Sequence, residues 1–570
     1  MDSTILQINE RMGDNDAEIS IFYSKGDKVS IGDAWIEDLS GNVIRKLSSK
    51  DVIDRSAISN SSLYSDDFVK TFELKHNQYP YRIVYSYKIV YSNYLSIVSL
   101  DYRRSKQPVK NGTVLIETPL EKEIRYEQAN VNNPLIDTVQ NVVQYKWNYA
   151  YEPILPEVYS SINTSKAPRI NIVPLNLKYG KTGSYSDWKS FGTWIYILNQ
   201  NRDILPQSEK DVINKILYGV DSDKEKVKIL YHYLQDYTRY INISINIGGL
   251  QTYPAEYVSV NKYGDCKALT NYMKAILAHA GIKSYYTLID AGRKIEDINI
   301  DFPHQAFNHV ILTVPIANDT IYLECTDKNI PMGYIGTFIQ GRKALSIDLL
   351  DSHFITIPPL KKEDVLCTRI FDIKLEPSGS ADINLKVSER GENYELFNFL
   401  KNDVSKITVD KYVRQSILSG SFDLLDYKLK QEDRDIGIIE MVLNCKMHNV
   451  HKKYGNDLVI SPFPFQLSNF ETPDKRSTDL QIDYPIYYSD TIICYVPNKQ
   501  IIGIPDNVNI ESSFGDQYKL EFEKLENQIL IYKTLFIRPK RLPVADYKPF
   551  YDFVKAVVGQ ENKNFYFETR

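Results

Sequence analysis

Hydrophobic and polar positions alternate along the first part of the chain, which predicts β-strands there. Residues 72–75 and 81–91 carry apolar or aromatic side chains at every second position, and β-branched and aromatic types dominate. Turn signals such as Asn111-Gly112 separate these runs. The pattern favours an antiparallel sandwich over residues 1–180. An extended connection is expected after it, where the prolines are Pro153, Pro156, Pro168 and Pro174.

From about Ser184 the apolar positions recur with the helical period instead. Ser222 and Glu225 form the Ser-x-x-Glu pattern of a capping box. The apolar side chains that follow it at helical spacing are Val227, Leu230, Tyr231 and Leu234. A second helix is expected to begin near Pro206, with Val212, Ile213, Ile216 and Leu217 as its apolar positions. Beyond residue 305 strands return, so this middle segment is predicted to be α+β.

After about Leu350 the strand pattern resumes, for example at residues 368–373 and 437–443. Inserted helices are expected near residues 396–400 and 406–418, and the aromatic tail around residues 531–551 should be folded. A chain of 570 residues is too long for one core. The fold class predicted is multidomain α+β, with a β-sandwich-like domain (1–180), an α+β core (181–350) and a mainly β domain (351–570).

Composition and charge narrow the classes of function. The net charge of −5 lacks the dense basic footprint that nucleic-acid binding requires. The chain has no run of about 18 apolar residues, so no transmembrane helix is expected. The first residues, Met1 to Ile5, show no basic segment followed by an apolar run, so no signal peptide is expected here. The 43 tyrosines indicate many half-solvated sheet faces; a tyrosine-lined peptide or carbohydrate groove is the alternative.

The cysteines and histidines argue against a metal site or a redox dithiol. The five cysteines, none in a Cys-x-x-Cys pair, are Cys266, Cys325, Cys367, Cys445 and Cys494. The eight histidines are scattered, and no His-x-x-x-His pair with an acidic partner occurs on a predicted helix. Neither a metal nor another cofactor is therefore predicted.

Cys266 is the strongest candidate for chemistry. Gly264 and Asp265 mark a tight turn before it, and apolar residues at helical spacing follow, up to Gly281 at the expected C-terminal cap. Cys266 should then lie in the first turn of a buried helix. There the unpaired backbone N–H groups and the helix dipole stabilise a thiolate, and the same donors can stabilise an oxyanion. The alternative is a cysteine that merely fills the core.

His309 offers a base for this thiol. It stands at the start of a predicted strand, and a turn near residues 316–319 leads into a second strand, 320–327. If the hairpin is centred between residues 316 and 317, His309 faces Glu324; if it is centred on Asn318, His309 faces Asp327. Facing residues share one side of a sheet, so either carboxylate could orient the imidazole. Nucleophile, base and acid together meet the requirement for an activated thiol.

These segments together resemble the transglutaminase-like core. The resemblance rests on Gly264-Asp265-Cys266-Lys267, Phe307-Asn308-His309 and Tyr322-Leu323-Glu324-Cys325-Thr326. Upstream, Tyr240-Ile241-Asn242-Ile243 and Gly248-Gly249-Leu250-Gln251-Thr252-Tyr253-Pro254-Ala255 resemble the lead-in of a bacterial branch. In that branch the papain-like α+β core lies between N- and C-terminal β domains of unknown function. The resemblance spans the chain and is strongest over residues 235–345.

The resemblance implies roles for individual residues. Cys266 matches the nucleophile, His309 the base and Glu324 the acid, although the family usually has Asp there; Asp327 is the alternative acid. Gln251 is a candidate oxyanion or substrate-positioning group. Three neighbours are expected to be structural or peripheral: His304 in a loop, His279 on the cysteine helix and Cys325 in the core.

The function expected is thiol acyl transfer on an amide bond, with hydrolysis favoured over transfer to an amine. The substrate class implied is a peptide, protein or cell-wall-type amide. The alternative is a catalytically weak or inactive scaffold that binds protein, peptide or glycan, because fold does not fix function. The resemblance also implies a periplasmic or cell-surface protein, with a cytoplasmic location as the alternative.

Overall fold

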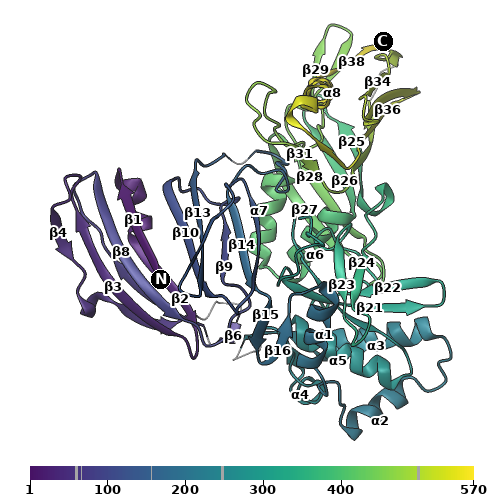
Figure 1. The fold of residues 1–570 in the computed structure, drawn as a ribbon. Coiled ribbons are helices and arrows are strands. Elements are labelled where there is room, and N and C mark those ends of the chain that lie inside the picture. Colours follow the sequence, from purple (N-terminus) through teal and green to yellow (C-terminus); the bar gives the residue numbers. More distant parts are fainter. Residues whose placement is uncertain (58–61, 66, 156, 245–248, 497–500) are drawn as a thin grey trace.

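The computed structural model describes residues 1–57, 62–65, 67–155, 157–244, 249–496 and 501–570. Pro156 and Gly248, which entered the predictions above, lie outside these residues. The described chain is a multidomain, β-rich α+β protein made of many mainly antiparallel sheets. Figure 1 shows an N-terminal β region, a central region that contains most of the helices, and a C-terminal β region. None of the described helices combines the length and the apolar character needed to cross a membrane.

The N-terminal β region (residues 2–184) contains two packed pairs of sheets. Strand orders β1-β8-β3-β4 and β2-β7-β5 enclose one core, around Ile36, Phe72 and Ile83. Orders β10-β13-β12 and β11-β14-β9 enclose another, around Trp147 and Ile172. The alternation at residues 81–91 is confirmed as a strand. The strands are β1 (Asp2–Ile8), β2 (Glu18–Ser24), β3 (Lys28–Glu37), β4 (Val43–Lys46), β5 (Ile53–Ser56), β6 (Ser62–Ser65), β7 (Asp67–Glu73), β8 (Tyr81–Val90), β9 (Val98–Asp101), β10 (Val109–Pro119), β11 (Ile124–Ala129), β12 (Leu135–Val139), β13 (Val142–Tyr151), β14 (Arg169–Pro174), β15 (Asn176–Tyr179) and β16 (Lys181–Ser184).

The turn predicted at Asn111-Gly112 is wrong, because both residues lie inside β10. The register of β10 against β13 shifts between Val109 and Gly112, as at a β-bulge. A Cβ at Gly112 would lie 2.1 Å from the ring of Tyr149 on β13. Glycine is needed at this position because the ring of Tyr149 lies over its Cα, and the chain does not turn there.

The proline-bearing connection docks on the C-terminal β region. Ser160 forms an isolated antiparallel bridge with Leu480. Glu157 accepts hydrogen bonds from the backbone N–H groups of Ser477 (2.6 Å) and Thr478 (2.9 Å). The buried Arg476 donates to the carbonyl of Val158 at 3.0 Å. These contacts place the two β regions side by side although they are far apart in sequence.

The central region (residues 188–356) packs its helices against a five-stranded antiparallel sheet, ordered β22-β21-β20-β23-β24. Its helices are α1 (Trp188–Leu198), α2 (Gln207–Ile216), α3 (Asp223–Tyr237), α4 (Ala255–Asn261) and α5 (Cys266–His279). Its strands are β17 (Arg239–Tyr240), β18 (Asn242–Ser244), β19 (Tyr263–Gly264), β20 (Tyr285–Ile289), β21 (His309–Ile316), β22 (Asp319–Leu323), β23 (Lys343–Ser346) and β24 (His353–Thr356). One core lies between α5 and the β21–β22 end of the sheet, and another between α1 and the same face at β20 and β23.

The helices predicted in this region are confirmed. Ser222 caps α3 by accepting from the backbone N–H of Glu225, and all four apolar positions expected on α3 are buried. The apolar face expected of α2 is narrower than predicted. Only Ile213 is fully buried, while Val212 is 38% exposed.

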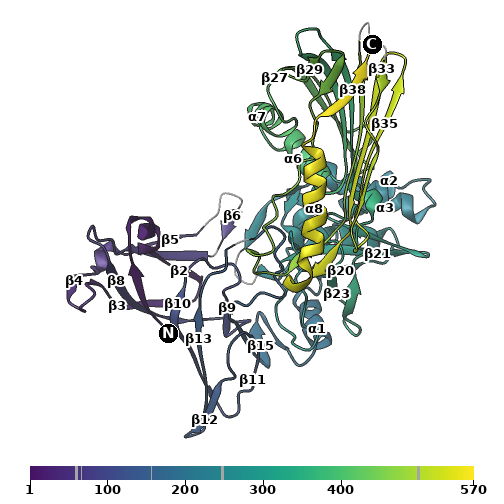
Figure 2. The ribbon, with the colours of Figure 1, turned by 90° about the horizontal axis from the view of Figure 1, so that it is seen from above.

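The C-terminal β region (residues 366–569) is built on an eight-stranded sheet, ordered β27-β28-β26-β25-β32-β36-β35-β34. Figure 2 shows α8 lying along this sheet. The buried Glu561 of α8 pairs with Lys533 (2.8 Å) and accepts from Tyr518 (2.6 Å), so buried polar contacts fix the helix to the strands. The strands are β25 (Leu366–Leu375), β26 (Ala381–Glu389), β27 (Phe422–Lys430), β28 (Ile439–Met447), β29 (His451–Tyr454), β30 (Asp457–Ile460), β31 (Leu480–Ile482), β32 (Ile486–Tyr495), β33 (Ile501–Gly503), β34 (Val508–Glu511), β35 (Gln517–Leu525), β36 (Gln528–Ile537), β37 (Lys540–Leu542) and β38 (Phe565–Thr569), and the helices are α6 (Gly391–Asn402), α7 (Lys406–Ser416) and α8 (Tyr547–Glu561).

Candidate active site

Cys266 is the first residue of α5, as the sequence predicts. Asp265 is the N-cap, and its side chain accepts from the backbone N–H of Ala268 at 2.9 Å. A Cβ at Gly264 would lie 2.8 Å from the Cβ of Ala268, so the chain can enter the helix this closely only with glycine. Cys266 is partly exposed, whereas the other four cysteines are buried. The thiol therefore sits where helix N–H groups face an accessible surface.

The cysteine helix is held by a buried carboxylate as well as by its apolar core. Glu209 of α2 accepts from the hydroxyl of Tyr272 on α5, from Tyr233 on α3 (2.7 Å) and from Ser259 on α4 (3.0 Å). Burial raises the pKa of Glu209, but the hydrogen bonds from Tyr272 and Tyr233 and the charge of Lys262 outweigh it and lower the pKa. One ionised side chain thus ties four helices together.

His309 opens β21 and faces Glu324 across a short gap. The distance from His309 Nε2 to Glu324 Oε2 is 2.6 Å. The other carboxylate oxygen, Oε1, accepts from the backbone N–H (2.9 Å) and the hydroxyl of Thr326. The hydroxyl of Tyr231 donates to the backbone carbonyl of Glu324 at 2.7 Å. Glu324 is only 3% exposed, so the carboxylate is fixed by these partners rather than by water.

Cys266 completes the arrangement from the other side of the imidazole. Burial lowers the pKa of His309, but the charge of Glu324 and hydrogen bonds to Cys266 and Glu324 outweigh it and raise the pKa well above its usual range. Burial alone would raise the pKa of Glu324, but the charge of His309 and the hydrogen bonds from His309 and Thr326 outweigh burial and lower that pKa. Because Nε2 faces Glu324, Nδ1 is the nitrogen available to the thiol. At neutral pH the pair is imidazolium and carboxylate.

Neither register expected for the hairpin is right. In the structure Leu312 faces Leu323 and Ile316 faces Asp319, so the position directly across from His309 is that of Thr326. β22 ends at Leu323, one residue before Glu324. One of the predicted registers placed Glu324 directly across from His309. The observed register differs from it by two residues, and such a shift keeps each side chain on the same side of the sheet. Glu324 therefore still reaches His309, diagonally.

The alternative acid, Asp327, is directed elsewhere. Its Oδ1 accepts from the backbone N–H of Asn329 at 2.8 Å, and its own carbonyl accepts from Gln235 at 3.2 Å. Burial raises the pKa of Asp327. Asp327 contributes to a pocket of about 410 Å³ between α3 and the loop after β22, which Asp403 of the C-terminal β region also lines. The structure brings Glu324, not Asp327, against the imidazole.

Gln251 does not present its amide to the thiol. Its Oε1 accepts from Arg202 at 2.8 Å and its Nε2 donates to the carbonyl of Leu198 at 2.7 Å. The amide is thus used to attach its loop to the end of α1. The expected oxyanion role finds no support in these contacts.

Tyr240 lies beside the segment that leads into Cys266, and the sequence analysis gave it no role of its own. It lies on β17 and pairs with Gly264, two residues before Cys266. Burial raises the pKa of Tyr240 to about 12, and the charges of Cys266, Asp265 and Glu324 add to the effect. The phenol is therefore protonated at neutral pH, and it lies close enough to Cys266 for a charge there to raise its pKa. In the sequence, the only indication of such a role was that Tyr240 belongs to the segment 240–243, which resembles the lead-in of the bacterial branch.

The remaining candidates are structural. His304 contacts the carbonyl of Phe302 through Nδ1 (2.8 Å) and lies against the ring of Trp188, and burial lowers its pKa. His279 is partly exposed and contacts Asn214, and Cys325 is in the core. Among the described residues no group of three or more potential ligands is arranged to hold a metal ion.

Comparison with known proteins supplies relatives for both flanking regions. Residues 2–154 match DUF3857 and residues 456–567 match DUF3858, each described as a domain of unknown function with a solved structure. A crystal structure of a candidate protease from Parabacteroides distasonis aligns with 99% of this chain and 95% of its own, with a TM-score of 0.65 and 14% identity. At this identity the likeness is one of fold. No curated protein matches the chain.

Proposed function

We propose that this chain is a transglutaminase-like thiol acyl-transfer enzyme that hydrolyses peptide or amide bonds. One observation carries the proposal: a partly exposed cysteine at a helix N-terminus contacts a histidine that is paired with a buried carboxylate. In this scheme Cys266 is the nucleophile, His309 the acid and base, and Glu324 the residue that orients His309. The proposed core spans residues 181–350, between β domains at 1–180 and 351–570.

The likeness in fold to a candidate protease supports hydrolysis as the outcome. The Cys266 sulfur, its proton held by His309, forms a bond to the amide carbon. The oxygen becomes an oxyanion, to which the backbone N–H of Cys266 and the Tyr240 hydroxyl would donate hydrogen bonds. The C–N bond then breaks as His309 gives its proton to the leaving amine.

Water completes the cycle. Its oxygen bonds to the thioester carbon while His309 takes one of its protons. The C–S bond breaks, a carboxylic acid leaves, and the thiolate and imidazolium are restored. If an amine takes the place of water, the same steps give amide exchange instead of hydrolysis.

The decisive experiment compares Cys266 with the buried cysteines. At pH 7 and limiting iodoacetamide, Cys266 should be alkylated at least tenfold faster than Cys445, as measured by peptide mass spectrometry. Fluorescein-labelled casein should be cleaved by the wild type and by C445A, but not by C266A. Incorporation of dansylcadaverine into casein would identify an amine as the acceptor.

Equal, slow labelling of all five cysteines would overturn the proposal. It would favour the alternative of a scaffold that keeps the core fold without turnover.

A further inference from the structure

The loop 290–308 ends at the residue before the proposed base. It connects β20 to β21 and contains neither helix nor strand. His309 itself pairs with Ile289 in the sheet, but the loop that enters it is the part of its surroundings without regular structure. The contacts of this loop therefore decide how well the imidazole is placed.

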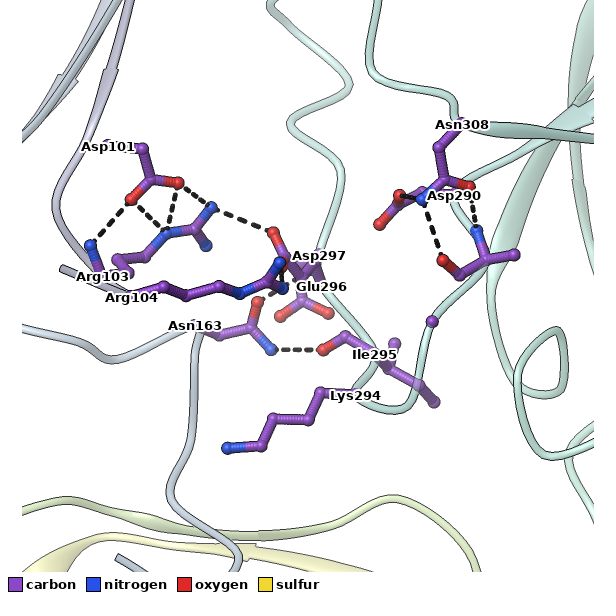
Figure 3. A network of polar contacts seen from close by, with 12 residues as sticks. Asp101, Arg103, Arg104, Asn163, Asp290, Lys294, Ile295, Glu296, Asp297 and Asn308 are labelled. Atoms are coloured by element: carbon purple, nitrogen blue, oxygen red, sulfur yellow. Dashed lines mark hydrogen bonds and ion pairs between the residues drawn. The ribbon is translucent and has the colours of Figure 1, made fainter. Parts of the chain in front are cut away.

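Asn308 closes the base of the loop. Its Nδ2 donates to Asp290 Oδ1 (2.8 Å) and to the carbonyl of Ala291 (2.9 Å), and its Oδ1 accepts from the N–H of Ala291 (2.8 Å). Figure 3 shows these bonds joining the last residue of the loop to its first two. The side chain adjacent to His309 thus fixes the separation of the two loop ends.

The N-terminal β region holds the middle of the loop. Glu296 pairs with Arg103 at 3.0 Å and with Arg104 at 2.6 Å (Figure 3). Asn163 donates to the carbonyl of Ile295 at 2.9 Å and accepts from the N–H of Asp297 at 2.8 Å. These contacts engage both a side chain and the backbone of the loop.

The C-terminal β region holds the same residues from another direction. Asp483 accepts from the backbone N–H of Ile295 at 2.9 Å, and the buried Gln481 donates to the backbone carbonyl of Ile295 at 2.8 Å. Arg541 pairs with Asp297 at 2.6 Å. Both backbone groups of Ile295 are thus satisfied by the flanking regions, and Asn163 contacts Gln481 directly at 3.2 Å.

We propose that loop 290–308 is the device through which both flanking β regions position His309, with Asn308, Glu296 and Asp297 as its positioning residues. The inference rests on the proposed function of the triad. Misplacing a catalytic group by about 1 Å can cost on the order of a hundredfold in rate. The flanking regions would therefore act on the chemistry through the placement of His309.

The test uses the full-length protein and two matched ion pairs between the C-terminal and central regions. The Arg541–Asp297 pair holds the loop, and its side chains are 45% and 59% exposed. The Arg434–Asp236 pair, at 3.0 Å, holds α3 instead, and its side chains are similarly exposed, at 43% and 53%. For each pair we would prepare both charge reversals and their double variant. These are R541D, D297R and R541D/D297R for the loop, and R434D, D236R and R434D/D236R for the control. N308A and E296Q complete the series.

Three quantities are measured: the rate of Cys266 alkylation by iodoacetamide, the titration of His309 by NMR on ¹³C-labelled histidine, and Tm. N308A should slow alkylation about tenfold, and R541D or E296Q about threefold, each with a lower apparent pKa of His309. R541D/D297R should restore both quantities. The Arg434–Asp236 set should leave both within twofold of the wild type, even where it lowers Tm.

Two results would overturn the inference. One is wild-type alkylation and His309 titration in both N308A and R541D; the other is an equal effect of the control pair. Failure of the proposed function looks different, because Cys266 of the wild type would then label no faster than Cys445. In that case the His309 titration alone decides whether the loop positions the imidazole.

Discussion

The two sides of the site are held by different kinds of contact. Cys266 is placed by its own helix, through a cap from Asp265 three residues before Ala268 and an apolar core inside the central region. His309 is placed by a loop whose polar partners are distant in sequence, such as Asp483, 188 residues from Ile295. The proposed nucleophile thus depends on local order, whereas the proposed base depends on how the regions dock. Each prediction below perturbs one side and leaves the other as reference.

The largest effect is expected on the base side, for E324Q. Without the carboxylate, burial dominates and the pKa of His309 falls from its raised value toward or below 6.5, so the imidazole is neutral at pH 7.5. Casein hydrolysis should drop by about a hundredfold or more, and His309 should titrate at lower pH by NMR. C445A, which keeps both Glu324 and Cys266, is the reference for the NMR shift.

The same pair carries a pH-dependent part of the stability. The folded pKa of His309 is raised, so its contribution is complete below about pH 6.5 and is lost as the pH rises through the folded value. Urea denaturation should show a loss of stability at alkaline pH that is absent in E324Q. An identical pH dependence in both proteins would contradict the ion pair.

Y240F should have the next largest effect, on the nucleophile side. Removing one oxyanion donor is expected to lower casein hydrolysis by about tenfold to a hundredfold. Alkylation by iodoacetamide forms no oxyanion, so its rate should stay within about twofold of the wild type. A parallel fall in both rates would show that Tyr240 supports the structure instead.

D265A tests the local order of the cysteine helix. Loss of an N-cap costs about 1 kcal/mol, which urea denaturation should resolve. D265N, which keeps a capping oxygen, is the matched control and should lose less stability. The titration of His309, on the other side, should change little; a change as large as in N308A would show that the two sides are not held independently.

The smallest effect is expected for Q251A. Its amide binds Arg202 and Leu198, so hydrolysis should remain within about threefold of the wild type while Tm falls slightly. A loss of activity comparable to that of Y240F, without a loss of Tm, would restore the oxyanion role to Gln251.

The same division explains what the sequence could predict. The helical spacing of Leu269 and Ile276 and the cap glycine Gly281 are local signals, and the structure has both. The tight turn expected at Gly264-Asp265 is wrong, because Gly264 ends the short strand β19 and Asp265 is an extended N-cap. The strand that begins with His309 was equally readable. Its pairing register was not, because turn geometry was ambiguous by one or two residues; Glu324 reached the imidazole because a shift of two preserves the face.

Long-range contacts were beyond the sequence. Nothing in a single chain indicates that Asn163 and Gln481 meet at Ile295, or that Gln251 turns toward α1. Asn111-Gly112 shows the same limit within a sheet, since the ring that requires Gly112 comes from Tyr149, far along the chain. Motifs located the candidate residues, and packing decided which of them meet.

The sequence separation of these contacts sets an order of assembly on the ribosome. Helix α5 can form as soon as the central region emerges, but Gln481 and Arg541 reach the base loop only after most of the chain has been made. At about 5–20 residues per second the lag is on the order of 10–50 s. A growing chain would therefore display the thiol of Cys266 before Gln481 and Arg541 can fix the loop that leads to His309.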